Sequence, residues 1–417
     1  MFEQLFDDPK TVARYRGGPL AEERSRYLVH LAEQGLARKT LRPACRYLLA
    51  AANGLRLAKR PNVVIGYAEI ERQGARWAKR LRKGFRQKGS DNERKCFVRW
   101  TVAWLRFLGR LRPQPVAPRR FEKQIVAFAD YCRQERGLAA STIRSDSHRL
   151  QKFFECLAGR VRKLQEITIA QIDEALIEHV SNGDYARNTI STLAYSLRAF
   201  FHYGERRGWC RAGIAAGIKA PCVFAEESLP AGPSWEQVQQ VLATTEGSRR
   251  ADIRDRAILM LLAIYGLRSV EVKRLKLEDL DWEHELLTVT RSKTRRTQSF
   301  PLVRSVGNAI LRYLKEVRPR SPLREVFLTR CAPWRPLRAN LWRMVAPRLR
   351  ALGVSLPHYG PHALRHACAT HLLAQGLSLK EIGDHLGHQH PDSTHIYTKV
   401  DLTGLRQVAD FDLGGLI

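Results

Sequence analysis

Residues 360–399 read GPHALRHACATHLLAQGLSLKEIGDHLGHQHPDSTHIYTK, and this stretch places three kinds of reactive or anion-binding group in one short segment. His362 and Arg365 form a His-x-x-Arg pair, His388 ends a Leu-Gly-His triplet, and Tyr397 follows nine residues later. On a helix, residues three apart share one face. An imidazole and a guanidinium on one face suit a phosphate, because both donate hydrogen bonds to anionic oxygens. A phenol hydroxyl beside them can attack phosphorus and form a covalent phosphotyrosine.

A further arginine lies upstream, where a strongly apolar helical pattern over residues 253–265 ends in the sequence Gly266-Leu267-Arg268. Glu271 follows three residues later, at the start of a new helical pattern. A guanidinium that is fixed by a nearby carboxylate is pre-organised for bidentate contact with a phosphate. Taken alone this motif is weak, because a surface ion pair at this spacing is the ordinary explanation.

Residues 285–291 and 297–303 each alternate as strands do, and the segment SKTRR at 292–296 predicts the turn between them. The pair therefore predicts a β-hairpin whose tip carries Lys293, Arg295 and Arg296. The plain interpretation is a basic hairpin that only touches phosphates. We predict such contacts for Arg291, Arg295 and Arg296.

Together these motifs resemble the signature of the tyrosine recombinases, the phage-integrase and Xer-like family, over roughly the last two thirds of the chain. The family is all-helical in its core-binding domain and places a catalytic lysine on a hairpin, eight residues before the proline of a closing Pro-Leu. Lys293 lies eight residues before Pro301. The resemblance thus implies six catalytic residues: Arg268, Lys293, His362, Arg365, His388 and Tyr397.

The resemblance also implies a role for each of these residues. Tyr397 would attack a scissile phosphodiester, leaving a 3′-phosphotyrosine and a free 5′-hydroxyl, while Arg268 and Arg365 stabilise the growing charge. His362 and His388 would add hydrogen bonds, with His362 helping to take the tyrosine proton. Lys293 would be the general acid, and Glu271 would orient Arg268. The bond energy stays in the covalent link, so neither ATP nor a metal cofactor is implied.

Three alternatives remain at this point. A type IB topoisomerase shares the tyrosine chemistry but usually has lysine in place of His362, so the histidine favours recombination. A DNA-binding regulator with a decayed site is opposed by the fact that all six expected positions are filled. A metal site is disfavoured because the His-x-x-x-His pair His362 and His366 encloses Arg365 and lacks the glutamate of His-Glu-x-x-His. For the surplus histidines, including His366, helix packing or surface exposure is the default.

Length and charge set the organisation of the whole chain. The 417 residues predict two or three domains, and the net charge of +30 favours double-stranded DNA as the partner. We predict a mostly helical protein with three parts: an N-terminal helical domain (1–112), a helical, SAM-like core-binding domain (119–220) and a mixed catalytic domain (234–417). Pro-rich segments at 112–118 and 221–233 mark the boundaries. The catalytic domain is expected to be α+β, with a small antiparallel sheet or hairpin.

Other candidate DNA contacts lie outside the catalytic domain. The segment 75–88 is dense in Lys and Arg, and we predict that Lys79, Arg80 and Lys83 follow a phosphate backbone; a solvated basic face is the alternative. Thr142 and Thr189 stand near the starts of two helices, each of which ends in paired phenylalanines. We predict that these two threonines cap their helices and contact phosphate.

The family resemblance and the composition of the chain also lead to expectations about its assembly and its location in the cell. The resemblance implies a DNA-bound homotetramer, because exchange of two duplexes needs four active sites, with partner recombinases possible. The eight cysteines contain no Cys-x-x-Cys pair, the N-terminus lacks an apolar leader, and no apolar run could span a bilayer. We expect a cytoplasmic, nucleoid-associated protein with no membrane contact. The large N-terminal block suggests a mobile-element enzyme of integration, excision or transposition.

Overall fold

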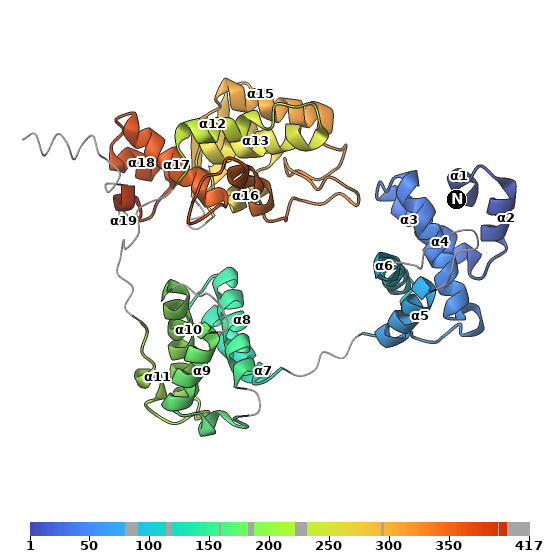
Figure 1. Cartoon of the computed structure of the whole chain (residues 1–417), viewed down its shortest axis with the longest axis horizontal. Helices are drawn as coiled ribbons and strands as arrows, with labels where there is room; N and C mark the ends of the chain where they lie inside the picture. Colours follow the sequence, from blue (N-terminus) through green and yellow to red (C-terminus); the bar gives the residue numbers. More distant parts are fainter. Residues whose placement is uncertain are drawn as a thin grey trace, which may run out of the picture. The chain divides into compact units, whose positions relative to one another are not determined.

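The computed structural model describes residues 1–79, 91–113, 119–157, 160–181, 187–221, 232–292, 296–390 and 392–397 (Figure 1). The chain divides into one compact unit, Pro115–Ser228, and a second unit that groups Met1–Gln114 with Leu229–Ile417. The second unit has separate hydrophobic cores in its N-terminal and C-terminal segments. The division into domains at 1–112, 119–220 and 234–417 stays a prediction.

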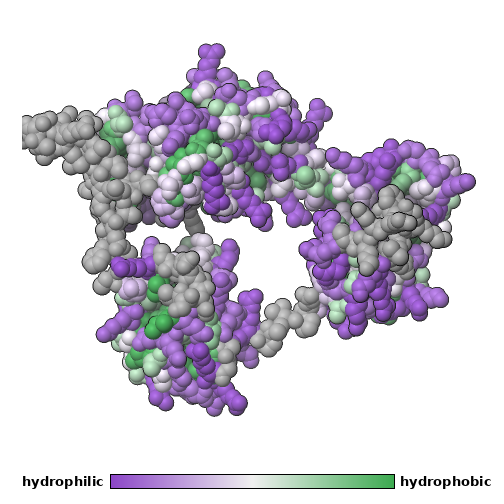
Figure 2. All heavy atoms as spheres, viewed as in Figure 1, coloured by the Kyte–Doolittle hydropathy of each residue, from purple (hydrophilic) through white to green (hydrophobic). Residues whose placement is uncertain are grey.

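The N-terminal segment is helical throughout its described residues. Its elements are α1 (Phe2–Leu5), α2 (Pro9–Arg16), α3 (Ala21–Glu33), α4 (Arg38–Gly54), η1 (Leu57–Lys59), α5 (Tyr67–Lys79) and α6 (Asp91–Phe107). Helix α2 starts at an Asp8 cap, whose carboxylate accepts from the backbone amides of Lys10 and Thr11, with Pro9 in the first turn. Leu48, Ile70, Phe97 and Trp104 are fully buried in the core that α3 to α6 share. Hydrophilic residues cover much of the visible surface (Figure 2).

The compact unit Pro115–Ser228 is also helical in its described residues, as the sequence predicts for 120–220. It consists of α7 (Glu122–Gln134), α8 (Ala140–Cys156), η2 (Leu164–Glu166), α9 (Ile169–Ser181), α10 (Arg187–Arg206) and α11 (Ile214–Gly217). The paired phenylalanines at the ends of α8 and α10 form the centre of the core. Phe154 and Phe200 meet edge to face with ring centroids 5.3 Å apart, and Phe128 of α7 lies 5.5 Å from Phe200. This geometry is the one that aromatic quadrupoles favour.

The C-terminal segment combines helices with a small sheet. Its elements are α12 (Trp235–Ala243), α13 (Arg250–Ile264), α14 (Ser269–Arg274), η3 (Leu277–Asp279), β1 (Leu280–Asp281), β2 (Leu286–Thr290), β3 (Thr297–Pro301), α15 (Arg304–Arg312), η4 (Tyr313–Val317), α16 (Trp342–Ala351), α17 (Pro361–Ala374), α18 (Leu379–Leu386) and α19 (Asp392–His395). The sheet is antiparallel with the order β1-β2-β3, and Leu287 of β2 pairs with Phe300 of β3. The mostly helical fold and the hairpin at 285–303 are confirmed, and β1 is an addition to it.

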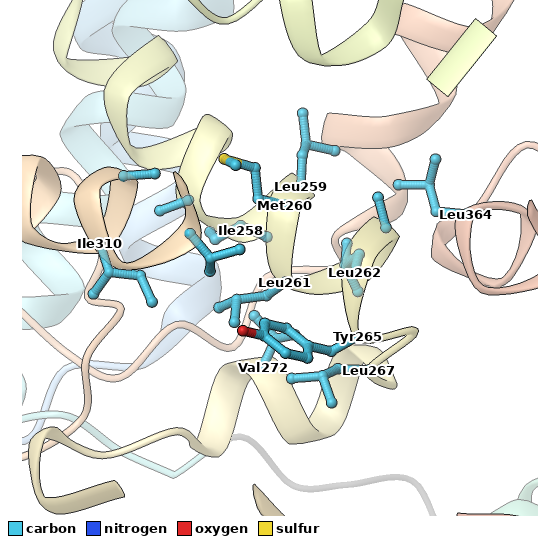
Figure 3. Close-up of a cluster of buried hydrophobic side chains, with 14 of the residues drawn as sticks. Ile258, Leu259, Met260, Leu261, Leu262, Tyr265, Leu267, Val272, Ile310 and Leu364 are labelled. Carbon is cyan, nitrogen blue, oxygen red and sulfur yellow. The ribbon is translucent and has the colours of Figure 1, made fainter. Parts of the chain in front are cut away.

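Helix α13 forms the centre of the catalytic core. Its C-terminal half, residues 257–263, is apolar on all sides and is buried all round, as such a helical segment must be. Leu259, Leu261 and Leu262 are fully buried, and they lie among side chains of α15 and α17 such as Ile310 and Leu364 (Figure 3). The loop that leaves α13 carries Arg268, so this packing fixes the position from which that arginine starts. None of the helices in the described part of the chain is both long and apolar enough to cross a bilayer.

Candidate active site

The His-x-x-Arg motif lies in the first turns of α17, which begins at the Gly360 cap with Pro361 in its first turn. The helix directs the two motif residues differently, because Arg365 is 5 % exposed while His362 is exposed. Arg365 donates from Nη1 to the carbonyl of Gly266 at 2.6 Å and from Nη2 to the carbonyl of Leu386 at 2.7 Å. Burial, followed by the charge of Arg268, lowers the pKa of Arg365 to about 10, so the guanidinium stays charged at neutral pH.

Three arginines meet the C-terminal end of α18. Arg291 donates to the carbonyl of His385, Arg365 to that of Leu386, and Arg268 to that of Gly387 at 3.3 Å. The last carbonyls of a helix have no partner within it, and the helix dipole makes this end partly negative. Cations are therefore stabilised there. We call these three residues the arginine cluster.

Gly387 ends α18 in the left-handed conformation, with φ of 66°, which suits glycine because it has no Cβ. A Cβ at this position would also lie 2.5 Å from Nε of Arg291. Gly266, at the end of α13, has φ of 57°, and a Cβ there would meet the side chain of Leu386 at 2.5 Å. The two glycines thus let the chain turn tightly on either side of the arginine cluster.

Glu271 is the counter-charge of the arginine cluster. Its carboxylate, which is buried, accepts from Nη1 of Arg268 at 3.0 Å and Nη1 of Arg291 at 3.2 Å, and from the backbone amides of Arg268 and Ser292. Burial acts to raise the pKa of this carboxyl, but the amides and the charge of Arg291 outweigh it, and the pKa is lowered. A buried carboxylate with this many donors stays ionised. The expected pairing of Glu271 with Arg268 is therefore present.

His388 follows Gly387 and is held by a residue of α19. Its Nδ1 lies 2.7 Å from Oγ1 of Thr394, which is almost fully buried. Burial, and then the charges of the arginine cluster, lower the pKa of His388 to about 4, so the ring is neutral at pH 7. If the threonine hydroxyl donates to Nδ1, the opposite ring nitrogen carries the hydrogen and can donate to an anion.

Tyr397 is 2 % exposed and packs with Cys368, Ile382 and Leu386 in a small core of its own. Its hydroxyl lies 3.0 Å from Nδ1 of His366, one turn after His362 on α17. Burial raises the pKa of Tyr397 to about 12, although the charge of nearby Arg365 acts to lower it. The phenol is therefore protonated at neutral pH.

The structure thus brings together five of the sequence-predicted residues around the end of α18: Arg268, Glu271, Arg365, His388 and Tyr397. His362 is near enough for its charge to affect His366. Lys293 and Arg295 lie outside the described residues. Arg296 is exposed at the start of β3, beside a hollow of about 630 Å³ that Gln298, Gly387 and His388 also line.

The prediction that Arg291 contacts DNA is corrected by the structure. Its side chain is 3 % exposed, and all three guanidinium nitrogens are used, by Glu271, the side chain of Gln298 and the carbonyl of His385. The pKa of Arg291 is lowered, mainly by burial, and the negative charge of Glu271 acts in the opposite direction. Arg291 therefore holds Glu271 and the end of α18 in place from the protein interior.

Of the remaining candidate DNA contacts, Lys79, Thr142 and Thr189 are exposed, near the end of α5 and the starts of α8 and α10. Their DNA contacts stay predictions. The predicted capping role of Thr142 and Thr189 does not hold, because both lie inside their helices and Ala139 is the cap of α8. Arg80 and Lys83 lie outside the described residues.

Sequence reasoning missed two residues of the site. The default expectation for His366 is packing or surface exposure, yet it contacts the hydroxyl of Tyr397. No sequence pattern marks Thr394, although it holds His388. The spacing of His366 from His362 was the one available signal. Within the described ranges, no three His, Cys, Asp or Glu side chains gather as metal ligands would.

The chain is similar to known proteins over most of its length. The model of the phage integrase family matches residues 234–403, and that of the N-terminal SAM-like domain of phage integrases matches residues 125–208. The chain is 34% identical to y4rA of Sinorhizobium fredii, named as a candidate integrase/recombinase, over 70% of this chain and 71% of that protein. It is 29% identical to the tyrosine recombinase XerC of Histophilus somni, over 68% of this chain and 94% of that protein.

Two solved structures share the fold. A lambda integrase dimer bound to a core site is 17% identical, with a TM-score of 0.52, over 66% of this chain and 94% of that chain. The Tn1549 transposon integrase in complex with circular intermediate DNA is 19% identical, with a TM-score of 0.51, over 69% of this chain and 99% of that chain. At such identities the likeness shows the fold.

Proposed function

Because this chain belongs to the phage integrase family of tyrosine recombinases, and is therefore a site-specific recombinase that cleaves and rejoins DNA, we propose that Tyr397 is its nucleophile. The phenol oxygen attacks the scissile phosphorus and forms a 3′-phosphotyrosine, while the 5′-oxygen departs as a hydroxyl. Attack of the freed hydroxyl on the phosphotyrosine rejoins a strand by the reverse step. The covalent link preserves the bond energy between the two steps.

The arginine cluster supports charge stabilisation as the main catalytic effect. Arg268 and Arg365 contact the non-bridging oxygens, where negative charge grows during attack. Both are already held by backbone carbonyls and, for Arg268, by Glu271, so little reorganisation is needed when the phosphate arrives. Fixed donors of this kind commonly provide the largest part of an enzyme's rate enhancement.

The other residues complete the reaction. His388, neutral and held by Thr394, donates a hydrogen bond to a non-bridging oxygen, and His362 donates another from the exposed side of α17. Lys293 protonates the leaving 5′-oxygen. Glu271 orients Arg268 and keeps the buried cluster charged.

DNA binding rests on the charge of the chain. The net charge of +30 favours a polyanion and predicts binding that weakens steeply with salt. Lys79, Arg80, Lys83, Arg295, Arg296, Thr142 and Thr189 are the proposed backbone contacts. The lambda and Tn1549 integrases, which share the fold, are bound to DNA in their structures, and this supports the same partner here.

Assembly and biological role follow from the same proposal. Two duplexes exchange strands through four active sites, so the working form is a homotetramer on paired DNA sites, in the nucleoid of the cytoplasm. The N-terminal segment adds a helical core of its own to the part that the family models match. Further DNA or partner contacts by this segment fit a mobile-element enzyme of integration, excision or transposition.

The hydrogen-bonded, protonated Tyr397 beside the arginine cluster is the observation that carries the proposal. The test uses a nicked suicide duplex, on which the wild-type protein accumulates a covalent adduct. Tyr397→Phe should bind the duplex with unchanged affinity and form no adduct. An adduct on the Phe variant would show that another residue is the nucleophile, and plasmid relaxation without recombinant products would indicate topoisomerase activity instead.

A further inference from the structure

The hydroxyl of Tyr397 has a specific partner in the interior, and that partner is a base. Nδ1 of His366 lies 3.0 Å from the phenol oxygen, and the two rings have centroids 5.7 Å apart at an angle of 58°. His366 projects from α17 one residue after Arg365, so the helix that holds the catalytic arginine also holds this imidazole. A nucleophile within hydrogen-bond reach of a fixed base is the arrangement found where a weak nucleophile must be activated.

The protonation states give the direction of this hydrogen bond. Burial raises the pKa of Tyr397 to about 12, so its oxygen carries the hydrogen at neutral pH. Burial, and then the neighbouring groups His362, Arg365 and His358, lower the pKa of His366, so its ring is neutral. The tyrosine O–H therefore donates to an unprotonated Nδ1, and the hydrogen of the neutral ring resides on Nε2.

We propose that His366 is the general base that takes the proton of Tyr397 when the phenol oxygen attacks phosphorus. The inference rests on the proposed role of Tyr397 as the nucleophile. A lone pair of the phenol oxygen forms the O–P bond, the O–H electron pair stays on that oxygen, and the proton moves to Nδ1, which leaves an imidazolium. The 5′-oxygen departs with the P–O electron pair and is protonated by the separate general acid. In strand rejoining the imidazolium returns its proton to the departing phenol.

Other groups near the nucleophile are less suited to this task. The family resemblance gives His362 a share in it, but His362 is exposed, whereas the phenol hydroxyl is bonded to His366. His388 presents Nδ1 to Thr394 at 2.7 Å, so that nitrogen already has a partner other than the phenol. Arg365 is a cation with both terminal nitrogens bonded to carbonyls. The lowered pKa of His366 does not prevent proton transfer during cleavage, because the negative charge of the attacked phosphate offsets the nearby cations. The same lowered pKa favours return of the proton to the phenol during rejoining.

The experiment separates proton acceptance from packing with two variants. His366→Asn keeps a polar atom near the position of Nδ1, but the amide of asparagine cannot accept a proton at neutral pH. His371→Asn is the matched control, since His371 is a half-buried histidine on the same helix whose ring stacks on Trp235 at 4.0 Å, away from Tyr397. Both variants, the wild type and Tyr397→Phe are compared in single-turnover cleavage of the nicked duplex, together with DNA affinity and thermal unfolding.

Loss of a general base should slow adduct formation by His366→Asn about 10²- to 10⁴-fold, with DNA affinity and unfolding temperature unchanged. His371→Asn should cleave as the wild type does. A second duplex with a 5′-bridging sulfur provides a leaving group that needs no proton, so it should restore cleavage to general-acid variants but not to His366→Asn. The wild-type rate should rise with pH through the pKa of His366, and this rise should be absent in His366→Asn.

Wild-type cleavage by His366→Asn, or recovery on the sulfur substrate, would overturn the assignment of His366 as the base. These outcomes are distinct from failure of the proposed nucleophile, which appears only as an adduct on Tyr397→Phe. The interpretation of the pH profile takes account of the titratable and charged groups that face His366, namely His358, His362, Arg365, His388 and Tyr397. The control with His371 distinguishes a specific effect from general damage to α17.

Discussion

Arg291 Nη1 and Glu271 Oε2 lie 3.2 Å apart in the interior of the catalytic core, with both side chains almost completely buried. Glu271 also contacts Arg268, so one buried carboxylate serves two guanidinium groups. A buried pair of this kind gives little net stability over an apolar pair, but removal of one partner leaves an uncompensated charge. The stability of the site therefore depends on keeping both the carboxylate and the guanidinium groups charged and paired.

Glu271→Ala is expected to lower the free energy of unfolding by about 3–5 kcal/mol, because Arg268 and Arg291 lose their buried counter-charge. Denaturant unfolding measures the change. The matched control is Glu316→Ala, which breaks an exposed i,i+4 pair with Arg312 and should cost about 0.5 kcal/mol or less. Equal effects of the two substitutions would contradict the structural role of Glu271.

Thr394→Val should reduce the cleavage rate about 3- to 10-fold, the range of one lost hydrogen bond, because Nδ1 of His388 loses the hydroxyl that fixes its ring. DNA affinity should not change. Thr244→Val is the control, since the Thr244 hydroxyl donates to the carbonyl of Val241 in the helix that precedes it. The prediction fails if the two variants cleave the suicide duplex at the same rate.

Gly387→Ala and Gly353→Ala form a matched pair, because both glycines have positive φ, 66° and 68°. At Gly353 a Cβ would meet no atom within 4 Å, so alanine should cost only the backbone strain, about 1–2 kcal/mol. At Gly387 the Cβ would displace Arg291, so the loss of stability should be larger, and cleavage should fall as well. Denaturant unfolding and adduct formation measured on both variants test this; similar losses would argue against the contact with Arg291.

Stability should fall as the solution is acidified below neutral pH. Burial, and then the arginine cluster, lower the pKa of His388 from its ordinary value of 6.5 to about 4. Between these two pH values the unfolded chain binds a proton that the folded chain does not, so the free energy of unfolding rises with pH across this window. The contribution of His388 to stability is lost as the pH falls toward 4. The lowered pKa values of His366 and His385 add to the slope. Unfolding at a series of pH values should give a smaller slope for His388→Asn than for the wild type, and identical slopes would refute the assignment.

The sequence predicted the elements of the site better than their contacts. Apolar periodicity and motif spacing indicated the hairpin and the helices that carry Arg268 and Arg365, because those features are local. Strand alternation also indicates that Arg291 is buried. Leu287 and Val289 in β2, and Arg291 directly after it, occupy alternate positions and are all buried. Period two therefore places Arg291 on the same inward face as the two apolar residues.

The contact between His366 and Tyr397 could not be read from the sequence. The tyrosine lies 31 residues after the histidine, and the two meet only because α18 and α19 return the chain to α17. Thr394 and His388 meet for the same reason, with α19 packed on α18. Such pairs depend on the path of the chain between helices, which no local pattern specifies.

The arginine cluster has one mechanical consequence. Its members donate to consecutive carbonyls of a single helical turn at residues 385–387, so a shift of that one short helix would act on all three guanidinium groups at the same time. Glu271 and the carbonyl of Gly266 would then be left to hold them alone, together with Gln298.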